Sequence, residues 1–251
     1  MGIIIFFFGT IWGSFFYTLS IRYINGSFND DKYNALFSRS NCPECGTKIN
    51  PLYLIPIFGY LILKGRCGSC KARISLLYPF FEIIYGLLLL LITSIHGVNP
   101  YAFCIFIIIG IGITISLIDL KTLLIPNSLL LVFSICSVYP VIINKSFLDN
   151  LYGMLFMALF FIIILLIFPG SFGGGDVKFA ALIGLLMGLE LSILTLETAL
   201  VSGSVAGIIY AVKTKSGFKS KIPFGPFLTF GFIVSIIYGR EIVLVYYRIL
   251  F

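Results

Sequence analysis

The chain has 251 residues, of which 59% are hydrophobic and 11% are charged, and its mean hydropathy is +1.10. A soluble domain of this size cannot bury so much apolar surface, so the composition excludes a water-soluble protein and predicts an all-α polytopic membrane protein. The net charge of +7 does not indicate nucleic-acid binding, because the basic residues lie in loops between apolar segments. In such loops they orient the protein and attract anionic headgroups, so we expect the lipid bilayer as a partner and no nucleic acid.

The apolar segments predict about eight transmembrane helices, since each is close to the roughly 20 residues that span a bilayer. They lie near residues 2–21, 78–96, 101–119, 126–143, 151–168, 177–189, 191–212 and 223–239. The first segment lacks the basic start and small-residue cleavage site of a signal peptide, so we expect it to be retained as a helix. The sixth and seventh segments meet where Glu190 and Glu197 interrupt a long apolar run.

The basic residues predict the orientation of the helices. Of the 17 Lys and Arg residues, 14 lie in the loops 22–77, 120–125, 169–178 and 213–222, and the other three are Lys145, Arg240 and Arg248. Because cytoplasmic loops carry an excess of Lys and Arg, the four loops are predicted to be cytoplasmic and the N-terminus to lie outside. This orientation requires an even number of crossings between residues 179 and 212. The sequence makes no prediction of the oligomeric state.

We expect three parts along the chain: a first transmembrane helix at 1–21, a cytoplasmic loop subdomain at 22–77 and a transmembrane bundle at 78–251. The loop subdomain is rich in Gly, Pro, Asn and Ser and is too small to form a stable core unaided. It carries two close pairs of cysteines, Cys42 with Cys45 and Cys67 with Cys70. Four thiolates at this spacing suit a tetrahedral zinc ion, whose binding would supply the missing folding energy. Two disulfides are the alternative, which a reducing cytoplasm disfavours.

Two aspartates are the candidate catalytic residues. Asp119 ends the third predicted crossing and Asp176 precedes the sixth, so the predicted orientation places both at the cytoplasmic face. A carboxylate at the edge of the hydrocarbon is costly and usually functional. Two neighbouring carboxylates do not easily both ionise, so an ionised one could activate water while a protonated one polarises a peptide carbonyl and then donates its proton to the leaving amine.

Six further residues are candidate supporting residues: Gly173, Gly174, Gly175, Lys178, Pro126 and Glu82. The three glycines leave room for a substrate backbone beside Asp176, and the proline suits the first turn of a helix. The glutamate begins the second crossing and could pair with a loop arginine such as Arg66 or Arg73. Taken alone, the two aspartates could also be solvated helix-end carboxylates or cation sites of a transporter.

Several motifs occur in the order typical of one family. They are Gly13-Ser14-Phe15 with Arg22, residues 39–46 and 65–70 around the cysteine pairs, Tyr78-Pro79 with Glu82, Asp119 with Ile125-Pro126-Asn127, Gly173-Gly174-Gly175-Asp176-Val177-Lys178, and Ile222-Pro223-Phe224-Gly225-Pro226-Phe227. Almost the whole chain thereby resembles the bacterial type IV prepilin peptidases, which are GxGD aspartic membrane proteases that also act as N-methyltransferases.

The resemblance implies that Asp119 and Asp176 are the peptidase pair and that the cysteine loop belongs to the methyltransferase-associated region. It implies prepilin or pseudopilin substrates, cleaved between a basic leader and an apolar helix at the cytoplasmic face of the bacterial inner membrane. It also implies S-adenosylmethionine as methyl donor, for which the chain offers no glycine-rich Rossmann unit. The alternatives are a GxGD protease for another helical substrate and an ion transporter that uses the same carboxylates.

Overall fold

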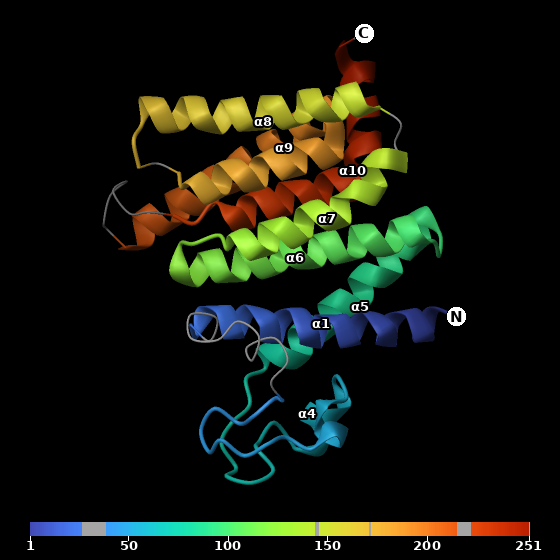
Figure 1. Ribbon diagram of the computed structural model, residues 1–251, viewed down its shortest axis with the longest axis vertical. Coiled ribbons are helices and arrows are strands. Elements are labelled where there is room, and N and C mark those ends of the chain that lie inside the picture. Colours follow the sequence, from blue (N-terminus) through green and yellow to red (C-terminus); the bar gives the residue numbers. More distant parts are fainter. Residues whose placement is uncertain (27–38, 144–145, 171, 215–221, 251) are drawn as a thin grey trace. The chain divides into compact units, whose positions relative to one another are not determined.

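The computed structural model describes residues 1–26, 39–143, 146–170, 172–214 and 222–250, which form helices joined by loops and two isolated β-bridges. Six of the described helices are long and apolar enough to cross a membrane, which confirms the all-α membrane fold (Figure 1). The chain forms two compact units, Met1–Phe106 and Ile107–Phe251. The predicted boundaries at 21/22 and 77/78 remain predictions, and the predicted loop residues Lys145, Lys215, Lys219 and Lys221 lie outside the described part.

The first unit is built on an antiparallel pair of helices, α1 (Gly2–Ile24) and α5 (Leu77–His96). Gly9 and Gly13 of α1 lie against the backbone of α5, where an added Cβ would come within 2.7 Å of the Tyr85 carbonyl oxygen and 2.9 Å of the Tyr85 Cβ, respectively. Small residues four apart let two helix backbones approach closely, which is a common way of packing helices in lipid. The cysteine loop, with the short helices η1 (Pro51–Leu54) and α4 (Phe58–Ile62), connects the two long helices.

Helix α6 (Pro100–Thr122) begins in the first unit and continues into the second. The second unit also contains α7 (Asn127–Ile143), α8 (Phe147–Ile167), α9 (Gly174–Thr214) and α10 (Gly225–Leu250). Their shared core includes the rings of Phe133, Phe179 and Phe232, none of which is exposed. Phe133 contacts both other rings, at centroid distances of 5.6 and 6.0 Å, and so ties α7 to α9 and α10.

Helix α9 consists of two helices that meet at Gly188, whose φ of 75° and ψ of 178° are not helical. Its 41 residues would extend about 60 Å if straight, twice the thickness of the hydrocarbon core. Gly175 in the first half lies against Ile125, and Gly203 in the second half lies against Phe224. Ile125 follows the C-terminal end of α6, and Phe224 precedes Gly225, which binds Asp119 at that same end. The second half of α9 therefore returns to the end at which the first half begins, so the two halves run in opposite directions. The predicted pair of crossings at 177–189 and 191–212 is thus present, with its turn two residues earlier than expected.

With the halves of α9 taken separately and the shorter α7 included, each of the eight predicted segments corresponds to a described helix. The largest difference is at α10, which continues to Leu250 although the prediction ended at residue 239. The prediction stopped at Arg240 and Glu241, but a charged pair does not end a helix, because long charged side chains can extend into water while the backbone stays helical.

Candidate functional site

Asp119 lies in the last turn of α6 and is buried, with 4% of its surface exposed. Its Oδ2 atom accepts a hydrogen bond of 2.9 Å from the backbone N–H of Gly225, the first residue of α10. About one and two turns before Asp119 along α6, the Ser116 hydroxyl donates to Thr229 Oγ1 at 2.7 Å, and Thr229 donates to the Gly112 carbonyl at 3.1 Å. These bonds fix the end of α6 against the start of α10 and thereby set the position of the Asp119 carboxylate.

Asp176 lies in the first turn of α9, where its Oδ2 atom accepts a 2.8 Å hydrogen bond from the Gly173 N–H. Its other oxygen, Oδ1, is buried and has no hydrogen-bond partner among the described residues. A carboxylate near the start of a helix is favoured by the helix dipole, but a buried oxygen without a partner is costly. The site therefore holds one carboxylate oxygen ready for a hydrogen-bonding group of a substrate or water.

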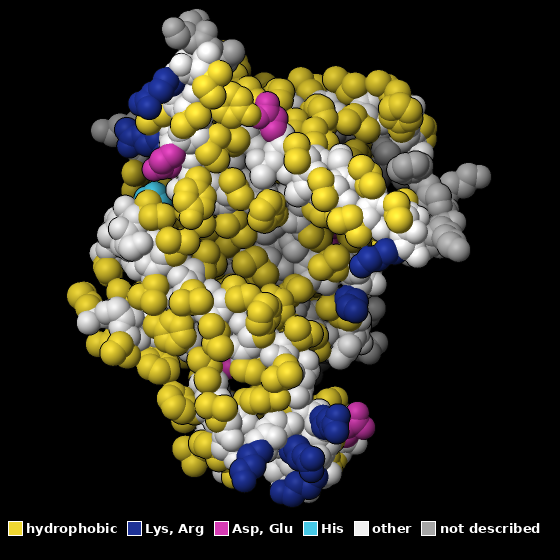
Figure 2. Space-filling view, turned by 180° about the vertical axis from the view of Figure 1, so that it is seen from behind, with side chains coloured by type: hydrophobic (Ala, Val, Ile, Leu, Met, Phe, Trp, Pro, Cys, Tyr) yellow, Lys and Arg dark blue, Asp and Glu magenta, His cyan; other side chains and the backbone are white. Residues whose placement is uncertain are grey.

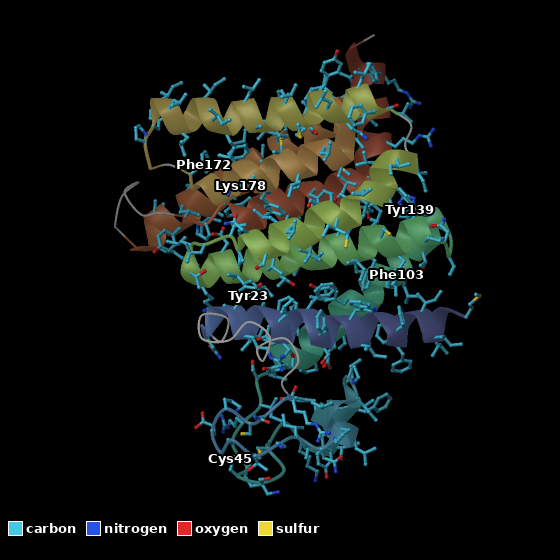
Figure 3. All side chains as sticks on the ribbon, viewed as in Figure 1. Tyr23, Cys45, Phe103, Tyr139, Phe172 and Lys178 are labelled. Carbon is cyan, nitrogen blue, oxygen red and sulfur yellow. The ribbon has the colours of Figure 1, made fainter. Side chains whose placement is uncertain are left out.

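The structure brings Asp119 and Asp176 together, close enough for their charges to interact. An aromatic cluster joins the segments that carry them. The Phe172 ring, just before α9, lies 5.0 Å from the rings of both Phe161 and Phe224, and Phe224 directly precedes the Gly225 amide that binds Asp119. Figure 3 shows Phe172 in the loop that leads into α9, with Lys178 on the first turns of the helix. The two acids, separated by 57 positions in the sequence, thus belong to one site.

The supporting residues that surround Asp176 have different neighbours. An added Cβ on Gly174 would meet no atom within 4 Å, whereas one on Gly175 would lie 2.9 Å from the Ile125 Cβ. Open space for a substrate therefore exists at Gly174, while Gly175 is required by the packing of the chain itself. Lys178 donates a 3.0 Å hydrogen bond to the Asn127 side chain and so links α9 to the start of α7. Pro126 directly precedes α7, and its carbonyl accepts the first hydrogen bonds of that helix.

Glu82 is buried in α5 and accepts a 2.7 Å hydrogen bond from the Ile57 backbone N–H. This contact differs from the predicted pairing with Arg66 or Arg73, which form a β-bridge with each other through their backbones. Sequence reasoning failed here because a backbone amide leaves no trace in the sequence, whereas a loop arginine is an obvious partner for a carboxylate. Glu82 belongs to the first unit, where it attaches the cysteine loop to α5.

The four loop cysteines form a second candidate site. Their Sγ atoms all lie within 4.8 Å of one another, so they could hold a metal ion. The thiols are free, and the Sγ atoms of Cys42 and Cys70 are 3.8 Å apart, well beyond the roughly 2.0 Å of a disulfide bond. The expected cluster of Cys42, Cys45, Cys67 and Cys70 is therefore present, and Figure 3 labels Cys45 in this loop.

The two cysteine pairs share one backbone geometry at an offset of 25 residues. In each pair the N–H of the first cysteine donates to the carbonyl five residues later, from Cys42 to Thr47 and from Cys67 to Ala72. The residue after each second cysteine, Gly46 or Lys71, has a positive φ and donates its N–H to the carbonyl of the first cysteine. This structural repeat was missed in the sequence, because only the cysteines themselves match clearly.

The surroundings of the four thiols give Cys45 and Cys70 very different pKa values. A hydrogen bond with the Thr47 hydroxyl, helped by the Thr47 backbone, lowers the pKa of Cys45 from 9.0 to about 6. For Cys70, the Ala72 backbone favours the thiolate, but the neighbouring thiols outweigh it and raise the pKa to about 12. A thiolate is the form that binds metal, so Cys45 is ready to bind at neutral pH, while Cys70 loses its proton only when a cation is bound.

Two family models match the chain. The model of the Bacterial Peptidase A24 N-terminal domain matches residues 7–96, and that of the Type IV leader peptidase family matches residues 105–212. The first match includes the four cysteines and the second includes both aspartates. No solved structure matches the chain.

Several curated relatives carry the name prepilin leader peptidase/N-methyltransferase. The protein of Bacillus subtilis is 30% identical over 249 residues, which is 98% of this chain and 97% of the relative. A protein of Burkholderia pseudomallei is 28% identical over 83% of this chain and 70% of its own length. A protein of Pseudomonas aeruginosa is 29% identical over 85% of this chain and 76% of its own length. On this evidence the chain belongs to the type IV leader peptidase family.

Proposed function

We propose that the protein is a prepilin leader peptidase in which Asp119 and Asp176 cleave the peptide bond and which then methylates the new N-terminus. The proposal rests on one observation in a chain of this family. The buried Asp119 at the end of α6 and the half-buried Asp176 at the start of α9 lie together. Its substrates are prepilins or pseudopilins, each with a basic leader followed by an apolar helix. The site lies at the cytoplasmic face of the inner membrane, where leader and helix join.

Hydrolysis in this site uses one proton shared by two carboxyl groups. The ionised carboxylate takes a proton from a water molecule as the water oxygen attacks the scissile carbonyl carbon. The protonated carboxyl group donates a hydrogen bond to the carbonyl oxygen and gives its proton to the leaving amine as the C–N bond breaks. The amides of Gly225 and Gly173 each hold one oxygen of an aspartate, so the carboxyl groups are already oriented before substrate binds.

The metal of the cysteine loop is zinc in this proposal. A tetrahedral four-thiolate zinc site with Zn–S bonds of about 2.3 Å has sulfurs about 3.8 Å apart, which matches the distance between Cys42 and Cys70. Four ligands leave no open coordination position, so the zinc stabilises the loop and takes no part in hydrolysis. S-adenosylmethionine supplies the methyl group, which is transferred from the donor sulfur to the new amine nitrogen as that amine loses a proton.

The proposal is tested by incubating the purified full-length protein in lipid vesicles with a prepilin and S-adenosylmethionine and measuring the product masses. We expect loss of the leader, and a mass increase of one methyl group only when the donor is present. Zinc chelation should reduce the rate of methylation more than the rate of cleavage, because the cysteine loop and the aspartates belong to different compact units. A wild-type protein that leaves every prepilin and pseudopilin intact would contradict the assigned substrate class.

A further inference from the structure

Residues 51–63 of the cysteine loop form an uncharged stretch, Pro-Leu-Tyr-Leu-Ile-Pro-Ile-Phe-Gly-Tyr-Leu-Ile-Leu, which contains η1 and α4. Its large side chains are exposed: Leu61 and Ile62 are 62% and 63% exposed, and Leu52 is 64% exposed. Tyr53, Leu54, Ile55 and Phe58 are exposed as well. Seven large apolar side chains on so short a segment would aggregate in water, so a partner must cover them. An apolar stretch of this length is too short to cross a bilayer but typical of a re-entrant or interfacial segment.

Contacts within the first unit place this segment beside the membrane-spanning part of α1 and α5. The Phe58 ring stacks on Phe7 of α1 at 5.8 Å, and the neighbouring Phe6 lies against Gly86 of α5. Gly86 is nine residues, or about 13 Å, beyond the start of α5 at Leu77. The segment therefore reaches well along the spanning helices and is not confined to their ends.

The irregular backbone at Ile57 is bound by a protein side chain, as hydrocarbon requires. Ile57 has a φ of 65°, which is rare for a β-branched residue, and this conformation directs its N–H to the Glu82 carboxylate. An irregular backbone at membrane depth is tolerated where protein groups bind its polar atoms. The same contact gives the buried Glu82 carboxylate of α5 a hydrogen-bond partner.

Charged side chains follow where the apolar stretch ends. Lys64, Arg66 and Arg73 line a hollow of about 530 Å³ together with Tyr60, and no acidic residue lines it. Figure 2 shows hydrophobic side chains on one side of the subdomain at the bottom of the view and Lys and Arg side chains on another. An apolar surface bordered by cations matches acyl chains bordered by anionic headgroups.

We propose that residues 51–63 form a re-entrant membrane anchor that inserts η1 and α4 into the acyl chains beside α1 and α5, with Lys64, Arg66 and Arg73 at the headgroups. The cysteine loop is then held against the bilayer surface. Lipid is favoured over a protein partner because the segment is uncharged throughout and packs along helices that themselves cross the membrane. This role is separate from hydrolysis and holds whatever the enzyme cleaves.

The chain has a single tryptophan, Trp12, which permits a direct test. In full-length protein with Trp12→Phe, Leu61→Trp places a probe on α4, and Glu44→Trp places a matched probe on an exposed position of the cysteine loop. Both variants are reconstituted in vesicles of lipids brominated in their acyl chains, and acrylamide serves as the aqueous quencher. Retained metal binding reports that the loop is folded, and Leu52→Trp replaces Leu61→Trp if the latter fails to fold.

We expect the bromolipid to quench most of the Leu61→Trp fluorescence and little of the Glu44→Trp fluorescence, and acrylamide to do the reverse. Equal access of acrylamide to both probes would overturn the proposal, because the segment would then lie in water. Protection of the α4 probe from both quenchers would also overturn it, since protein and not lipid would then cover the segment.

Discussion

Each aspartate of the site is held by a backbone amide that its own helix does not supply. Asp119 is bound by the N–H of Gly225, 106 residues later in the chain, and Asp176 by that of Gly173 in the preceding loop. Sequence reasoning identified both acids, since carboxylates at the ends of apolar segments are conspicuous. It assigned no role to Gly225, because an amide donor so distant in sequence can be found only from the packing of α6 against α10.

Replacing Gly225 with alanine should misplace Asp119. The added Cβ would lie 2.8 Å from Oδ2 and 3.3 Å from Cβ of that aspartate, so the carboxylate or the start of α10 must move. Displacements of this kind at a catalytic group cost about tenfold to 100-fold in rate, and we expect such a loss in kcat/KM for prepilin cleavage. Gly207→Ala, whose Cβ would meet only the end of the Ile222 side chain at 3.4 Å, is the matched control. Equal activity of the two variants would show that the Gly225 contact does not position the acid.

At the scale of elements, the reversal inside α9 allows both aspartates to lie at one end of the second unit. The sequence indicated two crossings from the positions of basic loops and the interruption near Glu190. It could not locate the turn, since the residue that makes it, Gly188, is one of several glycines in an apolar run. The position is fixed instead by α8, where Asp149 accepts a hydrogen bond from the Leu189 N–H at 3.2 Å.

Gly188→Ala should destabilise the turn between the halves of α9. The φ of 75° is unfavourable for alanine by about 1–2 kcal/mol, and the new methyl group would also collide with the Asp149 carboxylate. We expect a lower thermal midpoint in detergent than for the wild type, measured by intrinsic fluorescence, while Gly207→Ala remains close to the wild type. An unchanged midpoint for Gly188→Ala would mean that the turn tolerates a side chain and is not fixed by these contacts.

The cysteine loop should bind metal with an affinity that depends on pH in a defined way. The folded loop lowers the pKa of the Cys45 thiol to about 6, so this thiol is already ionised at neutral pH. Below that pH the thiol is protonated, and the metal must displace its proton in order to bind. We therefore expect the affinity to fall more steeply with decreasing pH below about 6 than above it, measured by competition with a chelating dye. Thr47→Val removes the hydroxyl that lowers this pKa and should move the change in slope to higher pH. If the slope changed at the same pH in the wild type and in Thr47→Val, the Thr47 hydroxyl would not be the group that lowers the pKa of Cys45.

At the scale of the whole molecule, the fold class, the number of apolar segments and the clustering of the four cysteines could be predicted from the sequence, and both aspartates could be named as candidates. Apolar length and charge placement determine membrane spans, and thiolate spacing determines a metal cluster, so these features are local. The partners of Glu82, Asp119 and Lys178 could not be predicted, because each depends on how segments distant in the sequence pack together. The long continuation of α10 was missed because a charged pair in its middle resembles the end of a membrane segment.

The orientation of the chain can be tested with reporter domains fused in the described loops. The two opposed halves of α9 and the basic residues predict that positions 123 and 169 lie in the cytoplasm and position 98 lies outside. A cytoplasmic reporter should be active at the first two positions and inactive at the third. Reporters on opposite sides at 123 and 169 would contradict a paired crossing of α7 and α8.

Whether Asp119 and Asp176 form one catalytic pair can be decided by measuring prepilin cleavage with Asp119→Asn, Asp176→Asn and the double variant. Each single substitution keeps the shape of the side chain but removes one acid, so we expect loss of cleavage in both, with no further loss in the double variant. Methylation of an already cleaved pilin and metal content should remain unchanged, which shows that the proteins are folded. Cleavage that persists in either single variant would contradict the two-carboxylate mechanism.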